Sequence, residues 1–280
     1  MAASSRVAPV ASGAPWPGRA RPARNRPSRR PKRRRPAAAP STRRTPLPAA
    51  PSRFDAVLLD LDGTLVDSLA DLRTALNATL AQEGLPPVSA AAVRAMVGDG
   101  ALALLQRALR ASGGDADRAA ELLPAFLAVY EPIAAAGTAL FPGAAEAVRA
   151  LREAGLALAI VTNKPARATG LILDAVGLTP LIDTVVGGDT LPQRKPDPAP
   201  LREALRRLGV EPGRAVMVGD MHHDIAAARA AGVAAILARY GYGRPEDADA
   251  ADAVLDDIGG LRVLIGALPG ALASGRAPAS

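Results

Sequence analysis

From residue 54 onward, short runs of aliphatic residues alternate with longer stretches that have helical periodicity. The aliphatic runs, which predict strands, lie at 56–62, 156–161, 184–186, 215–218 and 234–238. The later stretches, which predict helices, lie at 144–153, 166–176, 198–208 and 225–231. Continuous apolar strands that alternate with helices indicate a parallel sheet with helices on both faces. We therefore expect an α/β protein with a Rossmann-like core.

Between the first and second strands the chain shows helical patterns and no convincing strand. These patterns lie at 69–83, 93–109 and 119–136, joined through Gly98-Asp99-Gly100 and Gly113-Gly114. Ser68 and Asp71 have the form of a capping box that opens the first helix. We therefore expect a helical cap at 67–141, inserted into a core made of residues 53–66 and 142–280.

The first 52 residues form a tail rich in Arg, Pro and Ala. Before residue 55 the chain has 14 of its 34 basic residues and none of its 27 acidic ones, so the remainder has a net charge of −7 although the whole chain has +7. Frequent proline and like-charge repulsion predict disorder in the tail. It could be a transit peptide, a polybasic arm that binds nucleic acid or an anionic surface, or a dispensable or mispredicted extension.

Composition narrows the class of protein. The chain has no cysteine, which excludes disulfides and thiolate metal sites. No apolar run reaches the roughly 18–20 residues that a membrane span needs. The acidic body argues against nucleic-acid binding outside the tail. We expect a soluble cytoplasmic protein, or an organelle stroma protein if the tail is a transit peptide; the sequence does not indicate an oligomeric state.

Polar residues follow nearly every predicted strand. They are Asp60 and Asp62, then Thr162-Asn163-Lys164, then Lys195, and then Asp220 with Asp224 close behind. The carboxyl ends of parallel strands meet at one edge of the sheet, where such proteins bind ligands. Four carboxylates gathered there would repel one another unless a cation were present, and a set of oxygen ligands suits Mg²⁺. The sequence thus points to a magnesium site at this edge.

Two other phosphate or cation sites are excluded. A calcium loop starting at Asp60 would need glycine at its sixth position, where the chain has Leu65. A nucleotide-binding P-loop needs a Gly-Lys pair, which the chain lacks.

The chain has 3 Lys against 31 Arg, so Lys164 and Lys195 in strand-end loops suggest a site that requires a compact positive charge.

Four segments resemble the ordered motifs of the haloacid dehalogenase-like hydrolases. They are DLDGTLVDS, VTNKP, GGDTLPQRKPDP and VGDMHHDIAAARAAG, and the resemblance extends from Phe54 to about Ile265. It implies that Asp60 is the nucleophile that forms an aspartyl-phosphate and that Asp62 is the general acid and base. Thr162 and the Asn163 backbone would bind the phosphoryl group.

The same resemblance implies the remaining members of the site. Lys195 would neutralise charge on the nucleophile and the phosphate. Mg²⁺ would be held by the Asp60 carboxylate, the Asp62 carbonyl, Asp220 and Asp224. Dehalogenase members of the family lack an aspartate at the position of Asp62, so its presence favours hydrolysis of a phosphate ester.

Weaker signatures in the cap, the hinges and the last loop resemble phosphoglycolate phosphatases. They are LAQEGLPPVS, VRAMVGDGALALLQRAL, GTALFPG and ARYGYGRPED. This resemblance implies 2-phosphoglycolate as substrate, and we expect Arg94 and the turn at 98–100 to reach its non-phosphate end. Gly63, which allows a sharp turn after the two aspartates, is also expected at the substrate.

Two further interpretations of the function remain open. The chain could act on a sugar phosphate as a phosphatase or phosphomutase, or it could act through its basic tail as an interaction or nucleic-acid-binding protein.

One local feature departs from the family pattern. It is Met221, followed by His222 and His223, the only histidines. We expect both histidines to be solvated loop residues.

Overall fold

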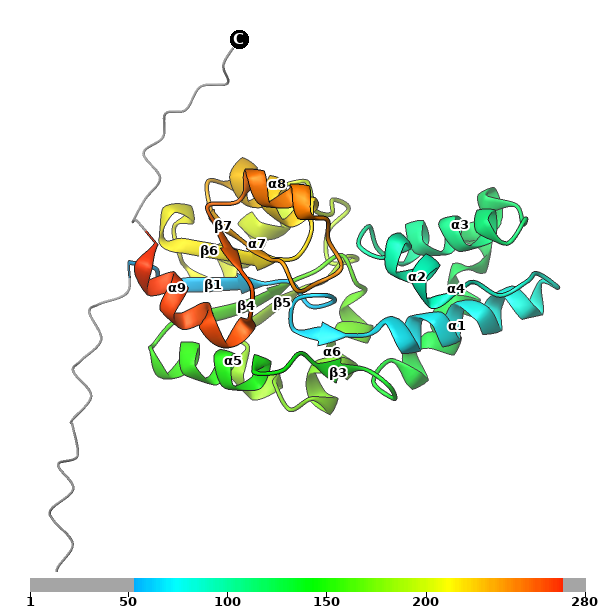
Figure 1. Ribbon diagram of the computed structural model, residues 1–280, viewed down its shortest axis with the longest axis horizontal. Coiled ribbons are helices and arrows are strands. Elements are labelled where there is room, and N and C mark those ends of the chain that lie inside the picture. The colour runs from blue at the N-terminus through cyan, green and yellow to red at the C-terminus, as the bar shows by residue number, and fades with distance from the viewer. Residues whose placement is uncertain (1–52, 269–280) are drawn as a thin grey trace, which may run out of the picture. The chain divides into compact units, whose positions relative to one another are not determined.

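A six-stranded parallel sheet forms the centre of the core (Figure 1). The structure is a computed structural model that describes residues 53–268, so the predicted disordered tail lies outside the described residues. The strands are β1 (Ala56–Leu59), β4 (Ala157–Val161), β5 (Thr184–Val186), β6 (Ala215–Gly219), β7 (Ala234–Ala238) and β8 (Ala253–Leu255). Their order is β5-β4-β1-β6-β7-β8, and every neighbouring pair is parallel. The predicted α/β class is confirmed.

Helices cover both faces of this sheet, as the apolar strands require. Successive side chains of a strand point to opposite faces, and in β1 the residues Val57 and Leu59 belong to one buried cluster whereas Ala56 and Leu58 belong to another. The first cluster includes residues of α5 (Ala144–Glu153), α6 (Ala166–Ala175) and α9 (Leu261–Ala267). The second includes residues of α7 (Ala199–Leu208) and α8 (His222–Ala231).

Four of the five α-helices between β1 and β4 come before the chain returns to the core. They are α1 (Leu69–Gln82), α2 (Ala90–Met96), α3 (Ala101–Ala111) and α4 (Ala119–Tyr130). A short antiparallel ribbon of β2 (Val66–Asp67) and β3 (Ala139–Leu140) joins the chain where it leaves the core and where it returns. We call residues 67–141 the cap, a division that remains our proposal.

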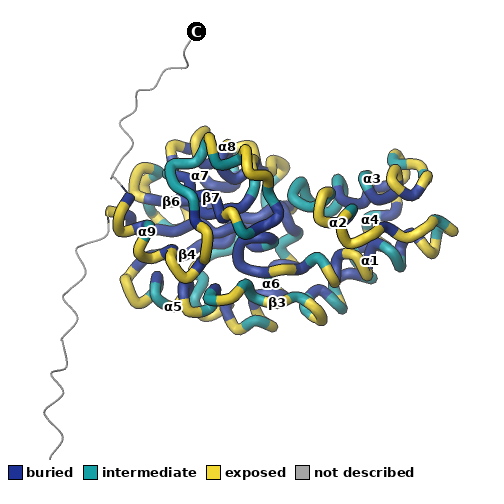
Figure 2. Tube along the Cα trace, viewed as in Figure 1, coloured by how far each residue is buried: buried dark blue, intermediate teal, exposed yellow. Residues whose placement is uncertain are grey.

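The helices of the cap pack against one another around a buried apolar interior. Leu76, Leu105 and Phe126, from three different helices, are all 1% exposed or less. The burial pattern in Figure 2 follows this arrangement, with buried positions along the inner sides of the cap helices. The apolar cluster that contains these residues also contains Leu59 of β1, so one continuous cluster extends from the sheet into the cap.

Several element boundaries differ from the sequence prediction. The helix expected over 93–109 is divided, because Gly98 and Gly100 have φ values of +127° and +89° that a helix cannot contain. The helix expected to reach residue 136 ends at Tyr130 and is followed by a 3₁₀ turn at Glu131–Ile133. The ribbon, β8 and α9 were not predicted; the strands of the ribbon have only two residues each, too few to show a period.

The predicted capping box at the start of α1 is wrong. The Ser68 side chain makes no capping hydrogen bond, and its hydroxyl donates instead to Asp62. The Asp71 carboxylate accepts hydrogen bonds from the Gly137 backbone N–H and the Thr138 hydroxyl, each at 2.8 Å. The side chains of Ser68 and Asp71 therefore hydrogen-bond to residues that are distant from the start of α1, and neither caps the helix.

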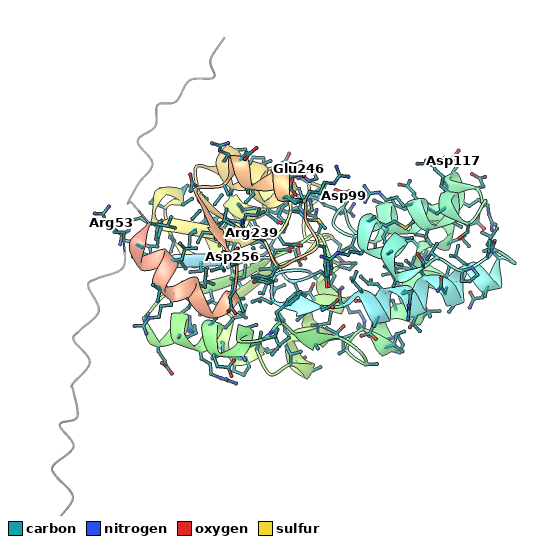
Figure 3. All side chains as sticks on the ribbon, viewed as in Figure 1. Arg53, Asp99, Asp117, Arg239, Glu246 and Asp256 are labelled. Atoms are coloured by element: carbon teal, nitrogen blue, oxygen red, sulfur yellow. The ribbon has the colours of Figure 1, made fainter. Side chains whose placement is uncertain are left out.

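Most charged side chains of the described body lie on its outside. Figure 3 shows Asp117 on the outside of the cap, and the ion-paired side chains of Arg239 and Asp256 are both more than half exposed. None of the helices between residues 53 and 268 is long and apolar enough to cross a membrane. The exceptions to the outward arrangement are six buried charged residues: Asp60, Asp71, Lys164, Lys195, Asp220 and Asp224. Five of them follow strands of the sheet.

Leu58→Ala should lower the free energy of unfolding by about 2–5 kcal/mol, because Leu58 is fully buried between β1 and the helices of the second cluster. Urea denaturation followed by circular dichroism measures this loss. Leu171→Ala in α6, where the side chain is 38% exposed, is the matched control and should cost less than about 1 kcal/mol. Equal losses in the two variants would contradict the assignment of Leu58 to the packed core.

Candidate active site

Asp60 begins the site, directly after β1 in the middle of the sheet. Its backbone N–H donates to the Val218 carbonyl of β6 at 2.9 Å, which continues the strand pairing and fixes where the side chain emerges. The residue is 5% exposed. Its Oδ1 lies 2.9 Å from the Lys195 ammonium nitrogen, with which it forms an ion pair, and no other described residue hydrogen-bonds to this oxygen. A buried carboxylate oxygen without a hydrogen bond is costly unless it serves a ligand.

Lys195 reaches the centre of the site from the loop after β5. Its fully buried ammonium group donates to Asp224 Oδ1 and to the Val161 carbonyl, each at 2.6 Å. The Asn163 side chain fixes the backbone of Lys195: its Oδ1 accepts from the Lys195 N–H at 3.0 Å and its Nδ2 donates to the Lys195 carbonyl at 2.9 Å. The same Nδ2 also donates to the Gly98 carbonyl of the cap. Asn163 therefore connects the β4 strand end, the lysine loop and the cap.

Asp220 follows β6 and is almost completely enclosed, at 1% exposure. Its carboxylate accepts hydrogen bonds from the Tyr242 N–H at 2.7 Å and the Thr64 hydroxyl at 3.3 Å. Gly63 lies against it with a φ of +85°, and a Cβ there would come within 2.2 Å of Asp220 Oδ2. Glycine at position 63 is therefore required both by the backbone angle and by the close approach.

Three buried carboxylates share one buried ammonium group at this point, and their pKa values reflect it. Burial raises the pKa of Asp60, although Lys195 opposes this effect. Burial and the neighbouring carboxylates Asp60 and Asp224 raise the pKa of Asp220 well above its usual value. Burial also acts to raise the pKa of Asp224, but Lys195, His223 and the Met221 N–H together more than offset it and the pKa is lowered. The three carboxylates are therefore only partly compensated by the single positive charge of Lys195.

Asp62 and Lys164 form a second, separate ion pair. The Lys164 ammonium nitrogen lies 2.9 Å and 3.1 Å from the two Asp62 carboxylate oxygens and 4.9 Å from the centre of the Tyr130 ring in the cap. Burial alone would lower the pKa of Lys164, but the Asp62 carboxylate raises it above its ordinary value, so the side chain stays charged. Thr162 is buried beside the pair, and its hydroxyl accepts from the Lys164 N–H at 3.2 Å.

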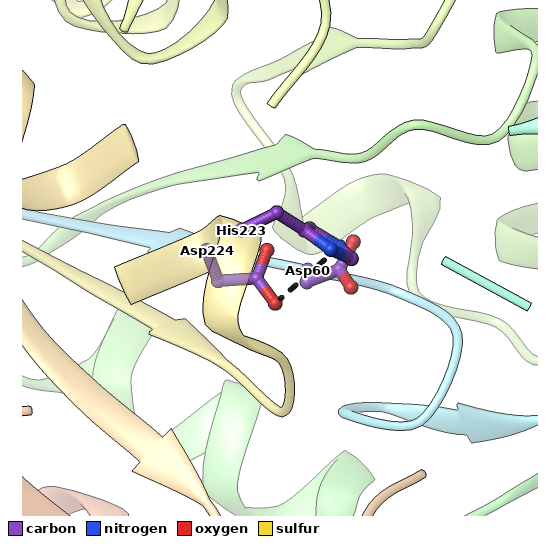
Figure 4. Close-up of side chains that lie close together, drawn as sticks. All are labelled: Asp60, His223 and Asp224. Atoms are coloured by element: carbon purple, nitrogen blue, oxygen red, sulfur yellow. Dashed lines mark ion pairs between the residues drawn. The ribbon is translucent and has the colours of Figure 1, made fainter. Parts of the chain in front are cut away.

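The expectation that both histidines are solvated is wrong for His223. The first turn of α8 turns this residue inward, where it is 2% exposed and its Nδ1 has no hydrogen-bond partner among the described residues, whereas His222 is exposed. Figure 4 shows His223 beside Asp224 and Asp60, with Nε2 of the histidine 3.9 Å from Asp224 Oδ2. The neighbouring positions 222 and 223 of a helix point in different directions, so only one of the two can face the site.

The site offers donors that suit a divalent cation. Among residues 53–268, Asp60, His223 and Asp224 form a group whose potential ligand atoms lie within 4.8 Å of one another. The unbonded Asp60 oxygen and the excess of buried negative charge both fit a hard cation such as Mg²⁺. Asp220 is close enough to Asp60 for the Asp60 charge to raise the pKa of Asp220, although Asp220 is not a member of that tight group.

A small cavity opens between these residues and the cap. Its polar side is formed by Asp60, Asp62, Thr162, Asn163 and Lys164. Its other walls come mainly from apolar residues of the cap, which are Leu72, Val97, Ala101, Leu104, Phe126, Leu127 and Tyr130. The turn at Gly98 and Gly100 also borders this cavity.

Arg94 is not at this cavity. Its guanidinium donates to the Gly241 carbonyl and lies 5.1 Å from the centre of the Tyr242 ring, and it borders a second, wider cleft. The structure therefore brings together the predicted aspartates, Thr162, Asn163, Lys195 and Gly63, but places Arg94 against the loop after β7.

The family is decided by the match of the chain to known proteins. A family model described as haloacid dehalogenase-like hydrolase matches residues 54–232, which include all four strand-end motifs. The chain belongs to the haloacid dehalogenase-like hydrolases. Relatives named phosphoglycolate phosphatase include one from Rhodospirillum rubrum, 49% identical over 74% of this chain and 88% of the relative, and one from Pseudomonas putida, 41% identical over 73% and 77%. Family and relatives together make this hydrolase a phosphoric monoester hydrolase.

Solved structures of the same family share the fold. A protein described as a predicted phosphoglycolate phosphatase from Haemophilus somnus has a TM-score of 0.72 and 33% identity, covering 76% of this chain and 98% of its own. CbbY from Rhodobacter sphaeroides, solved in complex with phosphate, has a TM-score of 0.67 and 30% identity over 74% and 96%. Phosphatases of this family generally use Mg²⁺, which agrees with the acidic donors found here.

Sequence reasoning missed two participants in the site of this hydrolase. Tyr130 gave no signal, because a tyrosine inside a predicted helix is ordinary and its contact with Lys164 joins residues 34 positions apart. His223 could not be separated from His222 without knowing how α8 is rotated. Lys164 did carry a signal, as one of only three lysines, but its pairing with Asp62 depends on the tertiary fold.

Gly63→Ala should lower the free energy of unfolding by more than about 2 kcal/mol, because the new methyl group meets the Asp220 carboxylate and the backbone must leave a positive φ. Denaturant unfolding measures the loss. Gly84→Ala is the matched control, since its φ is +69° but a Cβ there meets nothing within 4 Å, and it should cost only about 1 kcal/mol. If both substitutions cost the same, the close packing of Gly63 on Asp220 is not significant.

Proposed function

We propose that this hydrolase cleaves 2-phosphoglycolate to glycolate and phosphate through an aspartyl-phosphate on Asp60. The observation that carries the proposal is the Asp60 carboxylate itself, buried at a strand end, with an unbonded oxygen beside Lys195 and a cavity in front of it. A nucleophile of this kind must approach a phosphate that is also anionic, so positive charge has to be built in around it. Lys195 supplies part of that charge.

In the first half-reaction an Asp60 oxygen attacks phosphorus and the bond from phosphorus to the ester oxygen breaks. Asp62, in its acid form, gives its proton to that leaving oxygen, which departs as the alcohol of the product. Thr162 and the Asn163 backbone border the same cavity and would bind the phosphoryl oxygens. Lys195 would offset the charge of the aspartate and the phosphoryl group.

In the second half-reaction water attacks the phosphorus of the aspartyl-phosphate. Asp62, now a carboxylate, takes the proton from this water, and the bond from phosphorus to the Asp60 oxygen breaks. Inorganic phosphate leaves, Asp60 is again a carboxylate and Asp62 again carries its proton. One residue can serve both halves because the leaving oxygen and the water use the same position in turn.

Asp60, the Asp62 carbonyl, Asp220 and Asp224 would hold Mg²⁺ at this site, with His223 close by. When bound, the ion supplies positive charge that offsets repulsion between the nucleophile and the phosphate. The donor chemistry of the described residues fits this assignment, because carboxylate oxygens predominate and one of them has no hydrogen bond.

The choice of 2-phosphoglycolate follows the relatives named phosphoglycolate phosphatase. The second candidate is a sugar phosphate, because a CbbY variant from Rhodobacter sphaeroides in complex with xylulose-1,5-bisphosphate has a TM-score of 0.66 and 29% identity to this chain. The narrow cavity with apolar cap walls favours the smaller substrate. A cytoplasmic location fits the bacterial relatives. The predicted roles of the tail as a transit peptide or a binding arm concern residues outside the described part of the chain.

With Mg²⁺, the purified protein should hydrolyse 2-phosphoglycolate with a kcat/KM at least about tenfold higher than for any hexose or pentose phosphate, and with excess EDTA turnover should cease. Phosphate release across a panel of phosphomonoesters measures both effects, and restoring Mg²⁺ after EDTA is the control. A sugar phosphate as the best substrate would favour the second candidate. Hydrolysis of none of these esters would refute the proposed activity.

Asp60→Asn should lower kcat by about 10⁴-fold or more, because an amide cannot form the covalent intermediate. Steady-state phosphate release measures the loss. Asp117→Asn, which makes the same chemical change at an exposed position of the cap, is the matched control and should keep wild-type turnover. Substantial turnover by Asp60→Asn would exclude Asp60 as the nucleophile.

A further inference from the structure

Lys164 borders the cavity but has no role in the phosphoryl transfer proposed above. It is 6% exposed, and among the described residues that border the small cavity it is the one basic side chain. Two of its contacts are the Asp62 carboxylate oxygens, and the Tyr130 ring lies next to it. Its ammonium group is therefore placed beside the residue that protonates the leaving oxygen, on the side of the cavity where the leaving group must lie.

Tyr130 contributes a second polar atom to the same place. The residue is 1% exposed and borders the cavity, and its hydroxyl lies near the Lys164 ammonium group but forms no well-aligned hydrogen bond with a described residue. Burial raises the pKa of this hydroxyl to about 12, so it remains a proton donor. An unpaired buried hydroxyl costs free energy in the absence of a ligand, and an incoming acceptor would remove that cost.

The first turn of α3 opens onto the cavity as well. Gly100 and Ala101 border it, and Gly100, as the residue that precedes the helix, has no side chain to cap the free N–H groups. The start of a helix favours an anionic ligand. The start of α3 therefore favours a negatively charged ligand, as Lys164 and Tyr130 do.

We propose that Lys164 and Tyr130 form the subsite that binds the carboxylate of a short phosphorylated hydroxy acid. The inference rests on the proposed function and assigns its substrate specificity to two residues of this chain. In 2-phosphoglycolate a single carbon separates the carboxylate from the ester oxygen. A substrate whose ester oxygen faces Asp62 therefore has its carboxylate within the neighbourhood of Lys164, which binds Asp62 directly.

The other walls explain why the charge matters more than the rest of the leaving group. Leu104, Phe126 and Leu127 offer no hydrogen bonds. A polyhydroxylated sugar would lose its hydrogen bonds to water against these walls, whereas a two-carbon acid has no hydroxyl group to lose. The same walls exclude water, which strengthens the attraction between Lys164 and a carboxylate.

The test compares 2-phosphoglycolate with 2-hydroxyethyl phosphate, which has an alcohol in place of the carboxylate. In the wild type the ratio of the two kcat/KM values should favour the acid. Lys164→Met should reduce this ratio by roughly 10- to 100-fold and Tyr130→Phe by roughly 2- to 10-fold, the ranges for charged and neutral hydrogen bonds. Lys164→Arg should keep more of the ratio than Lys164→Met, and Arg149→Met, which removes one charge at an exposed site, should leave it unchanged.

A ratio makes the test independent of how Lys164 affects Asp62, because both substrates need the same acid. An unchanged ratio in Lys164→Met would overturn the proposal, as would a wild type with no preference for the acid. If Lys164→Met does not fold, Tyr130→Phe, which removes a single oxygen, decides in its place.

A binding measurement separates this proposal from the proposed function. Calorimetry with 2-phosphoglycolate and Mg²⁺ in the Asp60→Asn background should give a Kd that rises roughly 10- to 100-fold when Lys164→Met is added. The same Kd with and without Lys164 would overturn the subsite even if the wild type hydrolyses the ester. If the wild type does not hydrolyse 2-phosphoglycolate but Lys164→Met still weakens its binding, the proposed activity is refuted and the subsite is retained.

Discussion

The burial of three carboxylates around a single ammonium group is the constraint on which the rest of the structure depends. Lys195 contacts Asp60 and Asp224, and Asp220 lies next to them with only neutral donors of its own. Unpaired buried charge is among the most costly features that a fold can contain. Such a group persists only where the backbone holds it together and where a ligand can complete the charge balance.

The fold supplies that backbone through close approaches that permit no side chain. A Cβ at Gly219 would come within 2.3 Å of Asp224, and one at Gly241 within 2.3 Å of Asp220. The carboxylates themselves follow the central strands β1 and β6, whose pairing fixes their separation. Rigid strand ends and bare glycines thus position groups that would otherwise move apart, which is what preorganised chemistry at a phosphate requires.

The cap completes the site from the opposite side by two kinds of contact. Asn163 donates both to the cap turn at Gly98 and to the backbone of Lys195, so the cap and the central lysine share one side chain. Lys164 contacts both the Asp62 carboxylate and the Tyr130 ring, so Asp62 and the cap share a second side chain. The residues to which we assign the chemistry are therefore in direct contact with residues of the cap that border the cavity.

Much of this could be predicted from the sequence, because strand-end residues follow from the period of the apolar pattern. The order of strands and helices, and the gathering of Asp60, Lys195 and Asp220, needed only that pattern and the geometry of parallel sheets. What could not be predicted depends on tertiary contacts: the partner of Ser68, the inward rotation of His223 and the pairing of Lys164 with Tyr130. Arg94 was expected at the substrate, but its contacts with Gly241 and Tyr242 place it at another cleft.

The central claim is that Asp60 becomes covalently phosphorylated, and the most direct test is to find the phosphate. The enzyme is mixed with Mg²⁺ and 2-phosphoglycolate, quenched in acid during turnover, digested and analysed by peptide mass spectrometry. The account predicts a phosphorylated peptide that contains Asp60, which is absent when the substrate is omitted and in the Asp60→Asn variant. Phosphate on a different residue, or turnover without phosphate on any peptide of the quenched enzyme, would contradict it.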